Sequence, residues 1–198
     1  MKFLYLIIVV FLSACAVQGN VLSSQGLING WDHSGFRNMK DGVVIVFHVE
    51  NKDRIRLDET LVGITINDRL EDLEPDIGKK PFLIRVSVNA IGSDVYIKQN
   101  AKLTLEGTVY LPRKVKVGTD KVKSGRVSNE VSASHYDDFM GIDNTLRGND
   151  FNWLWLEFDI ATPHPNQSFK LNLELKNGER KEVLEANFNL KQMNIYHH

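Results

Sequence analysis

Residues 169–188 read FKLNLELKNGERKEVLEANF, and this stretch decides the fold. Apolar and polar residues alternate on both sides of Asn177-Gly178, which is the period of a β-strand with one buried and one wet face. Asn-Gly is a preferred two-residue connection in β-hairpins, because both positions of a type I′ turn need a positive φ. The sequence therefore predicts an antiparallel hairpin that turns at Asn177-Gly178.

The register of this hairpin follows if the two residues next to the turn face each other. Opposite charges then meet on the wet face and apolar residues meet on the dry face, as favourable cross-strand pairs do. A one-residue slip would move every core side chain to the other face. The expected pairs are Lys176 with Glu179, Glu174 with Lys181, Lys170 with Glu185, Leu171 with Leu184, and Phe169 with Ala186.

The same two-residue period begins at Val43 and continues along the chain, and no stretch has a convincing helical period. The expected core positions are Val43, Ile45, Phe47 and Val49; Val62, Ile64 and Ile66; Phe82, Ile84, Val86, Val88 and Ala90; and Leu103, Leu105, Val109 and Leu111, with a short strand at 95–98. We expect residues 43–198 to form one all-β domain. Its architecture is predicted to be a two-sheet antiparallel sandwich, immunoglobulin-like, of about eight strands.

The N-terminal residues predict where the protein is located. Lys2 precedes an apolar run over residues 3–12, which is too short to span a bilayer and is typical of a secretory signal. The residues Leu12-Ser13-Ala14-Cys15 resemble the lipobox of bacterial lipoproteins. This resemblance implies cleavage before Cys15 and acylation of its thiol and new amine; the alternative is an ordinary signal peptide cut after Ala14. In the enterobacterial lipoproteins that this stretch resembles, an Asp after the cysteine favours retention in the inner membrane. Ala16 stands there instead, so the resemblance implies an outer-membrane anchor that faces the periplasm.

Residues 15–42 and the composition restrict the classes of function that the protein can have. Residues 1–14 are assigned to the signal peptide, and residues 15–42, rich in Gly, Ser, Asn and Gln, to a lipid-anchored tether and domain entry. Without Lys2, 23 of the 24 Lys and Arg residues remain against 25 Asp and Glu, a balance that argues against a nucleic-acid binder. Cys15 is the only cysteine, so no disulfide forms inside the chain and no other thiol is available as a nucleophile.

The lipobox and the sandwich together resemble the outer-membrane lipoproteins of type VI secretion systems, and also lipoproteins that neutralise toxins in the periplasm. The resemblance covers the architecture and the lipobox. We expect a non-enzymatic module, anchored in the envelope by its lipid, that recruits or caps a protein partner. One alternative is an immunity lipoprotein that inhibits a periplasmic toxin. Another is an envelope hydrolase, although Gly-x-Ser-x-Gly, His-Glu-x-x-His and glycine-rich phosphate loops are absent.

Two stretches are candidate binding surfaces. Residues 153–160 read WLWLEFDI, in which Leu154, Leu156, Phe158 and Ile160 make a core face, while Trp153, Trp155, Glu157 and Asp159 share the other. These four form either a partner-binding patch, since Trp is enriched at interface hot spots, or a cluster covered by the long stretch after Pro112.

The first half of that long stretch is basic. Lys and Val alternate around Gly118-Thr119-Asp120, which suggests a protruding hairpin whose basic residues are Arg113, Lys114, Lys116, Lys121, Lys123 and Arg126. Such a hairpin can dock onto lipid phosphates or an acidic protein surface, or it can be a solvated ribbon whose lysines prevent edge-to-edge aggregation.

Its second half is acidic and polar: His135, Asp137, Asp138, Asp143, Asn144 and Asp150. Oxygen ligands at short spacing can bind calcium, but this spacing does not match an EF-hand loop, and one histidine is too few for a zinc or iron site. We therefore expect no metal and no cofactor.

Overall fold

A computed structural model of the chain describes residues 15–61, 64–71, 76–90, 94–121, 125–144 and 150–197. The signal peptide assigned to residues 1–14 lies outside this part of the chain, as does the side chain of Cys15. The described residues form an all-β protein of two antiparallel sheets, with a single 3₁₀ turn, η1 (Ala133–His135). This confirms the predicted two-sheet antiparallel arrangement.

The larger sheet has the order β10-β9-β15-β16-β1-β5-β6, with β8 beside β15 and β13 beside β8. Its strands are β1 (Cys15–Ile28), β5 (Asp53–Leu61), β6 (Ile64–Glu71), β8 (Val95–Lys98), β9 (Lys102–Leu105), β10 (Thr108–Tyr110), β13 (Phe139–Gly141), β15 (Phe169–Asn177) and β16 (Arg180–His197). The smaller sheet has the order β12-β11-β14-β7-β4-β3-β2. Its strands are β2 (Asp32–Ser34), β3 (Arg37–Lys40), β4 (Val43–Val49), β7 (Phe82–Ala90), β11 (Lys114–Lys121), β12 (Gly125–Val131) and β14 (Asn152–Phe158).

The core lies between the two sheets and is built by the alternation seen in the sequence. Every second residue of β4, β7 and β14 meets every second residue of β15 and β16; the fully buried side chains include Ile45, Ile84, Val86, Leu154, Leu156, Leu171 and Leu173. Aromatic contacts join the sheets, because Phe188 stacks on Phe169 at 4.5 Å and meets Phe47 edge-on at 5.2 Å. The core positions predicted in 43–49 and 82–90 are confirmed, whereas Val62 and the side chains of Ile64 and Ile66 lie outside the description.

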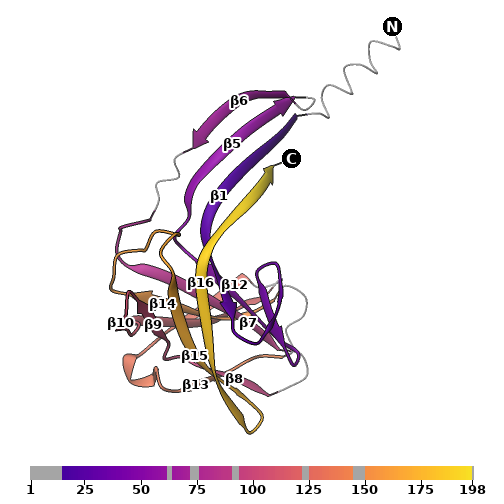
Figure 1. Ribbon diagram of the computed structural model, residues 1–198. Coiled ribbons are helices and arrows are strands. Elements are labelled where there is room, and N and C mark those ends of the chain that lie inside the picture. Colours follow the sequence, from indigo (N-terminus) through magenta and orange to yellow (C-terminus); the bar gives the residue numbers. More distant parts are fainter. Residues whose placement is uncertain are drawn as a thin grey trace, which may run out of the picture.

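The larger sheet extends beyond the sandwich body as an arm, which consists of β5, β6 and the paired segments 15–21 and 193–197 (Figure 1). The prediction of a flexible tether from residue 15 is therefore wrong. Cys15–Ile28 is one continuous strand that pairs with β16 on one side and β5 on the other. A Gly- and Ser-rich composition weakens a strand, but two hydrogen-bonding neighbours satisfy its backbone along most of its length.

The β15–β16 hairpin exists, with a register that differs from the predicted one by two residues. Phe169 faces Phe188 and Leu171 faces Ala186, so the two central turn residues are Gly178 and Glu179. Gly178 has φ +58° and Glu179 has no positive φ, which fits a turn with glycine at its first central position. A two-residue shift leaves every side chain on its predicted face, so the core assignment holds although the pairs change.

The strand predicted through Leu103 and Leu111 is a hairpin instead. Glu106 and Gly107 have φ values of +50° and +79°, the pattern of a type I′ turn, and they divide the stretch into β9 and β10. Val109 and Leu111 are each 58% exposed, whereas Leu103 is buried. Splits of this kind, and strands in the predicted tether and loop, give sixteen strands in the described residues rather than about eight.

Candidate functional site

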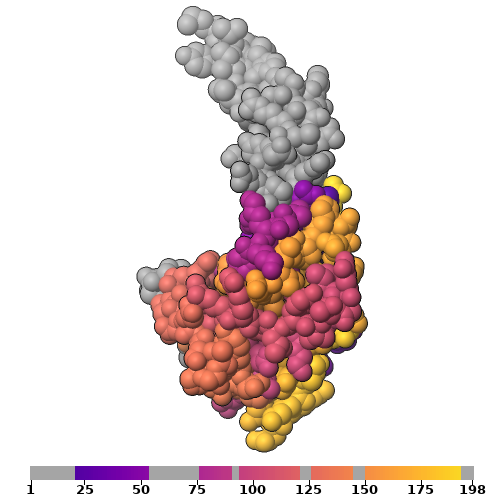
Figure 2. Space-filling view, turned by 90° about the vertical axis from the view of Figure 1, so that its left-hand side faces the viewer, coloured from indigo at the N-terminus to yellow at the C-terminus, as the bar shows by residue number. Residues whose placement is uncertain are grey.

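The stretch after Pro112 is largely ordered in the described residues. Its basic part forms the antiparallel pair β11–β12, in which Lys121 faces Gly125, so Gly118-Thr119-Asp120 lies within a strand and not at a turn. The following segment packs against β8 through β13, and Asn100 donates to Asp137 at 3.0 Å. Figure 2 shows residues 126–144 and 95–110 side by side on one face of the body.

Several of the basic residues on this hairpin already have acidic partners. Lys114 Nζ lies 2.7 Å from Glu130, Arg113 Nε lies 2.6 Å from Glu157, and Arg126 Nε lies 3.0 Å from Asp120. The side chain of Lys121 and all of Lys123 lie outside the described part of the chain. Docking of the six basic residues onto lipid phosphates or an acidic surface stays a prediction, and at least three of them are engaged within the protein.

Trp153 lies on the face opposite the core residues, as predicted, but its side chain is covered. Trp153 is only 3% exposed, although its neighbour Leu154 points into the core as expected. Its indole lies against Gly118 of β11, where a Cβ would come within 2.7 Å of the ring, and its N–H donates to Asp120 at 3.2 Å. The alternative of a cluster covered by the stretch after Pro112 therefore describes Trp153.

The other three residues of the predicted patch are not a free surface either. Trp155 is half-buried, and Glu157 accepts from Arg113. Asp159 Oδ1 lies 3.6 Å from Lys80 Nζ and 3.8 Å from Arg113 Nη1. The two carboxylates are thus balanced within the chain, and nothing in this geometry favours partner binding by the four residues.

The packed indole is part of the outer face of the smaller sheet. Neighbouring strands align their outward side chains in two rows, which are Gly118–Trp153–Ser87–Val46 and Lys116–Trp155–Arg85–His48. The side chain of Arg85, in the central strand β7, is 16% exposed, and its Nη1 lies 3.9 Å from Asp120 Oδ2. Its Nε is buried and has no hydrogen-bond partner in the described structure.

A groove of about 540 Å³ opens on this outer face, beside β1. Its volume falls in the range of small-molecule and side-chain binding sites. Its lining combines apolar and charged side chains, among them Phe36, Val46, Phe151, Arg37, Lys52, Arg85, His48, Glu50 and Asp120. Such a mixture can hold a ligand that has both an apolar part and a charge.

The groove has a positive electrostatic character, because three cations, Arg37, Lys52 and Arg85, line it against two acids, Asp120 and Glu50. Burial and the nearby charges of Arg85, Lys52 and Arg126 lower the pKa of His48 from 6.5 to about 4, while Asp120 acts in the opposite sense. The ring is neutral at pH 7, because burial and the neighbouring cations both disfavour the imidazolium. Burial, followed by the charge of Arg126, also lowers the pKa of Arg85.

Arg85 and His48 were not among the residues that sequence reasoning selected. The signal for Arg85 is visible: it is the one charged residue in the strand FLIRVSVNA, on the face that alternation assigns to solvent. Exposed arginines are common, however. The sequence does not show that Arg85 shares Asp120 with Arg126 or that a groove forms beside Arg85.

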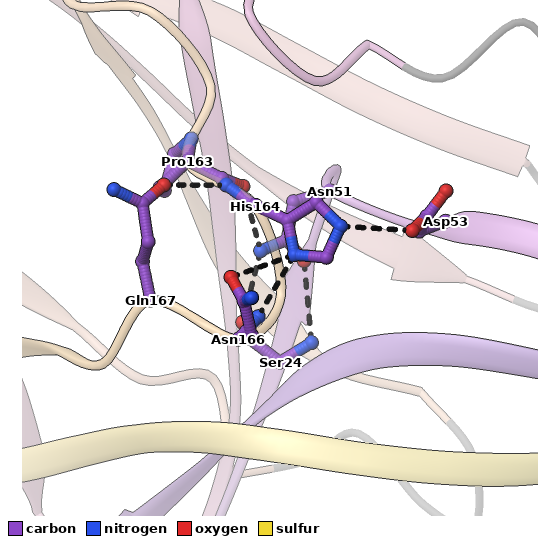
Figure 3. Close-up of polar contacts among 7 residues, drawn as sticks. All are labelled: Ser24, Asn51, Asp53, Pro163, His164, Asn166 and Gln167. Atoms are coloured by element: carbon purple, nitrogen blue, oxygen red, sulfur yellow. Dashed lines mark hydrogen bonds and ion pairs between the residues drawn. The ribbon is translucent and has the colours of Figure 1, made fainter.

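A second polar cluster lies where the arm meets the body (Figure 3). His164 Nε2 lies 2.9 Å from Asp53 Oδ2, and His164 Nδ1 lies 2.7 Å from Asn166 Oδ1. The buried Asn51 donates to the Ser24 hydroxyl at 2.9 Å and to the carbonyl of Pro163 at 3.2 Å. The Ser24 hydroxyl is thus bonded to Asn51 and not to the histidine, so this arrangement links loop 163–167 to β1 and β5 without the geometry of a catalytic triad.

In the part of the chain that the structure describes, no three His, Cys, Asp or Glu side chains gather closely enough to hold a metal ion. The acidic stretch considered for calcium is partly engaged elsewhere, since Asp137 lies 3.4 Å from Lys98. Among the described residues, no helix has the length and apolarity to cross a membrane. No protein-family model, curated protein or solved structure matches this chain.

Proposed function

We propose that this protein is a lipid-anchored binding module of the bacterial envelope, which holds a protein partner in the periplasm. The observation that carries the proposal is the groove on the outer face of the smaller sheet, where apolar side chains and partly unpaired cations share one concave surface. The finer immunoglobulin-like architecture belongs to the proposal: sandwiches of that kind are common as binding domains on cell surfaces.

The arm supports a role at a distance from the membrane. Cys15 begins β1 at the outer end of the arm, and Ser24 of the same strand lines the groove. An extended strand rises about 3.3 Å per residue, so the nine steps between them span roughly 30 Å. With Cys15 acylated in the outer membrane, β1 acts as a paired, stiff spacer that presents the groove to the periplasm.

The lipid anchor has its own test. Cys15→Ser should abolish acylation and move the protein from the membrane fraction to the soluble fraction, since no other anchor is proposed. Mass spectrometry of the wild-type protein should find a mature chain that begins at Cys15 with its acyl chains. A mature chain without lipid would contradict the anchored part of the proposal.

The binding role is tested by capture from envelopes. The acylated protein, cross-linked in place and purified, should retain a protein partner, and Phe36→Asp should remove that partner. Phe36 lines the groove and is 42% exposed, so the change alters the surface without emptying the core. Val183→Asp, at a 70% exposed position of β16 outside the groove lining, is the matched control and should keep the partner. Equal capture by the two variants would contradict the role of the groove.

The immunity alternative is the same kind of binding with a toxin as the partner. It predicts that the captured protein is a secreted toxin whose activity falls when the complex forms. No contact in the described structure favours the hydrolase alternative over binding.

A further inference from the structure

We infer that the groove receives a carboxylate of the partner protein, carried next to an apolar side chain, and that Arg85 is its principal anchor. The inference rests on the proposed binding function and adds to it the chemistry that the partner must present. It is carried by three observations: the unpaired Nε donor of Arg85, the prior engagement of Asp120, and the mixed lining of the groove.

Arg85 has more donors than acceptors around it. A guanidinium offers five N–H donors in a fixed plane. The buried Nε has no partner in the described structure, and the closest carboxylate oxygen, Oδ2 of Asp120, is 3.9 Å from Nη1, beyond hydrogen-bond distance. A buried unsatisfied donor is unfavourable in the free protein. Arg85 also lines the groove, so an acceptor that enters the groove lies beside its guanidinium.

Asp120 does not fill that place, because its Oδ2 stays 3.9 Å from Arg85 Nη1 while its Oδ1 serves two other groups. Its Oδ1 accepts from Arg126 Nε at 3.0 Å and from Trp153 Nε1 at 3.2 Å. One carboxylate therefore balances two guanidinium groups. Its position is also fixed by the indole, which packs between β11 and β7.

The rest of the groove keeps a positive surplus. Arg37, Lys52 and Arg85 line it together with two acids, Asp120 and Glu50, and Arg126 adds a further charge beside Asp120. In the described residues, neither Arg37 nor Lys52 has an acidic side chain within ion-pair distance. An acidic group that enters the groove meets attraction from these cations, and it does not have to displace an existing ion pair.

The shape of the groove favours a carboxylate on a peptide over a bare anion. A planar guanidinium matches a carboxylate through two parallel N–H···O bonds. Phe36, Val46 and Phe151 offer apolar surface near this anchor, which a small inorganic ion would leave uncovered. A Glu or Asp beside an aromatic or aliphatic residue satisfies both parts of the lining.

The test uses two peptides that differ in one group, acetyl-Phe-Glu-Phe-amide and acetyl-Phe-Gln-Phe-amide, with the mature protein observed by NMR. The Glu peptide should shift the Arg85 Nε–H resonance and raise the pKa of His48, because it brings a negative charge into the groove. Its affinity should exceed that of the Gln peptide by about ten-fold or more, the size expected for a hydrogen bond between charged groups. Equal affinities of the two peptides would overturn the inference. So would binding of inorganic phosphate that outcompetes the Glu peptide, since the groove would then be a phosphate site.

Variants locate the anchor. Arg85→Gln should remove the preference for the Glu peptide, and Arg37→Gln, at an exposed position of the rim, should weaken it less. Arg180→Gln is the matched control, because Arg180 lies at the β15–β16 turn and outside the groove lining. A Glu preference that survives Arg85→Gln in a folded protein would overturn the inference. If Arg85→Gln does not fold, the Arg37→Gln, Lys52→Gln double variant, which keeps Arg85, should retain the preference for the Glu peptide, and its complete loss there would overturn Arg85 as the principal anchor.

Envelope capture separates this inference from the function on which it rests. If wild-type protein retains a partner that Arg85→Gln also retains, the carboxylate anchor is wrong and the binding function stands. If the acylated wild-type protein retains no partner, the proposed function itself is wrong.

Discussion

The outer faces of the two sheets differ in how fully their charged side chains are paired with opposite charges. On the larger sheet, Lys170 and Lys98 meet partners of opposite charge: Lys170 Nζ lies 3.1 Å from Glu185 Oε1 and Lys98 Nζ lies 3.2 Å from Glu174 Oε1. On the smaller sheet, Asp120 is divided between Arg126 and Arg85, and the buried Nε of Arg85 has no partner in the described residues. The first face resembles an ordinary solvated surface. The second keeps a local deficit of acceptors, which is unfavourable for stability and useful for binding.

The largest loss of stability should come from replacing Trp153, whose indole is packed on the outer face of the smaller sheet. Trp153→Ala removes a 3% exposed side chain that fills the space above Gly118, and it should lower the free energy of unfolding by about 3–5 kcal/mol. Trp155→Ala, at a half-buried position of the same strand, should lower it by clearly less. Urea titration of both variants measures the difference. Similar small losses would mean that this face is not packed.

Next in size is the test of the faces of the β15 strand. Leu171→Ala should lower the free energy of unfolding by about 2–5 kcal/mol, since the side chain is fully buried between the sheets. Lys170→Ala removes an exposed ion pair with Glu185 and should change it by less than about 1 kcal/mol. Comparable losses in urea would refute the assignment of inner and outer faces.

The predictions for Trp153 and Leu171 also show which features of the fold can be predicted from the sequence. Alternation placed Leu171 and Leu154 in the core, because period two assigns faces without knowing which strands are neighbours. The hairpin register was missed, since a two-residue shift preserves that alternation and both Asn177-Gly178 and Gly178-Glu179 are compatible with a tight turn.

The candidate site was harder to predict than the fold. Trp153 has the correct parity for the outer face, but its burial depends on Gly118, which lies 35 residues earlier in the chain and opposite it in the sheet. The groove draws on β1, β3, β4, β7 and the neighbourhood of β11, so its formation depends on strand order. Strand order is set by long-range packing, which a local pattern does not contain.

A smaller effect should appear as a dependence on pH. The pKa of His48 is about 4 in the folded protein, against 6.5 as its ordinary value, so between these pH values the unfolded chain binds more protons. The stabilising contribution is complete above pH 6.5 and is lost as the pH falls toward 4. Because solvent reaches the ring, we expect a loss of only about 1 kcal/mol.

This dependence is measured by difference. Urea titrations of the wild type and of His48→Gln at pH 7.5 and 4.5 should show a smaller decrease of stability in the variant, since carboxylates elsewhere titrate equally in both. Parallel decreases would show that burial and the cations of the groove do not keep His48 neutral in the folded protein.

The most direct test of the central claim compares one residue from each outer face. Arg85→Met removes a buried donor without a partner and leaves Asp120 bonded to Arg126 and Trp153, so we expect the free energy of unfolding to rise by about 1 kcal/mol. Lys98→Met removes the contacts with Glu174 and Asp137 and should lower it by less than about 1 kcal/mol. Urea unfolding of each variant and of the wild type gives the sign of each change in the free energy of unfolding. A gain at position 85 together with a loss at position 98 is the predicted result; a loss of stability in Arg85→Met would contradict the claim that this face holds an arginine whose partner is yet to bind.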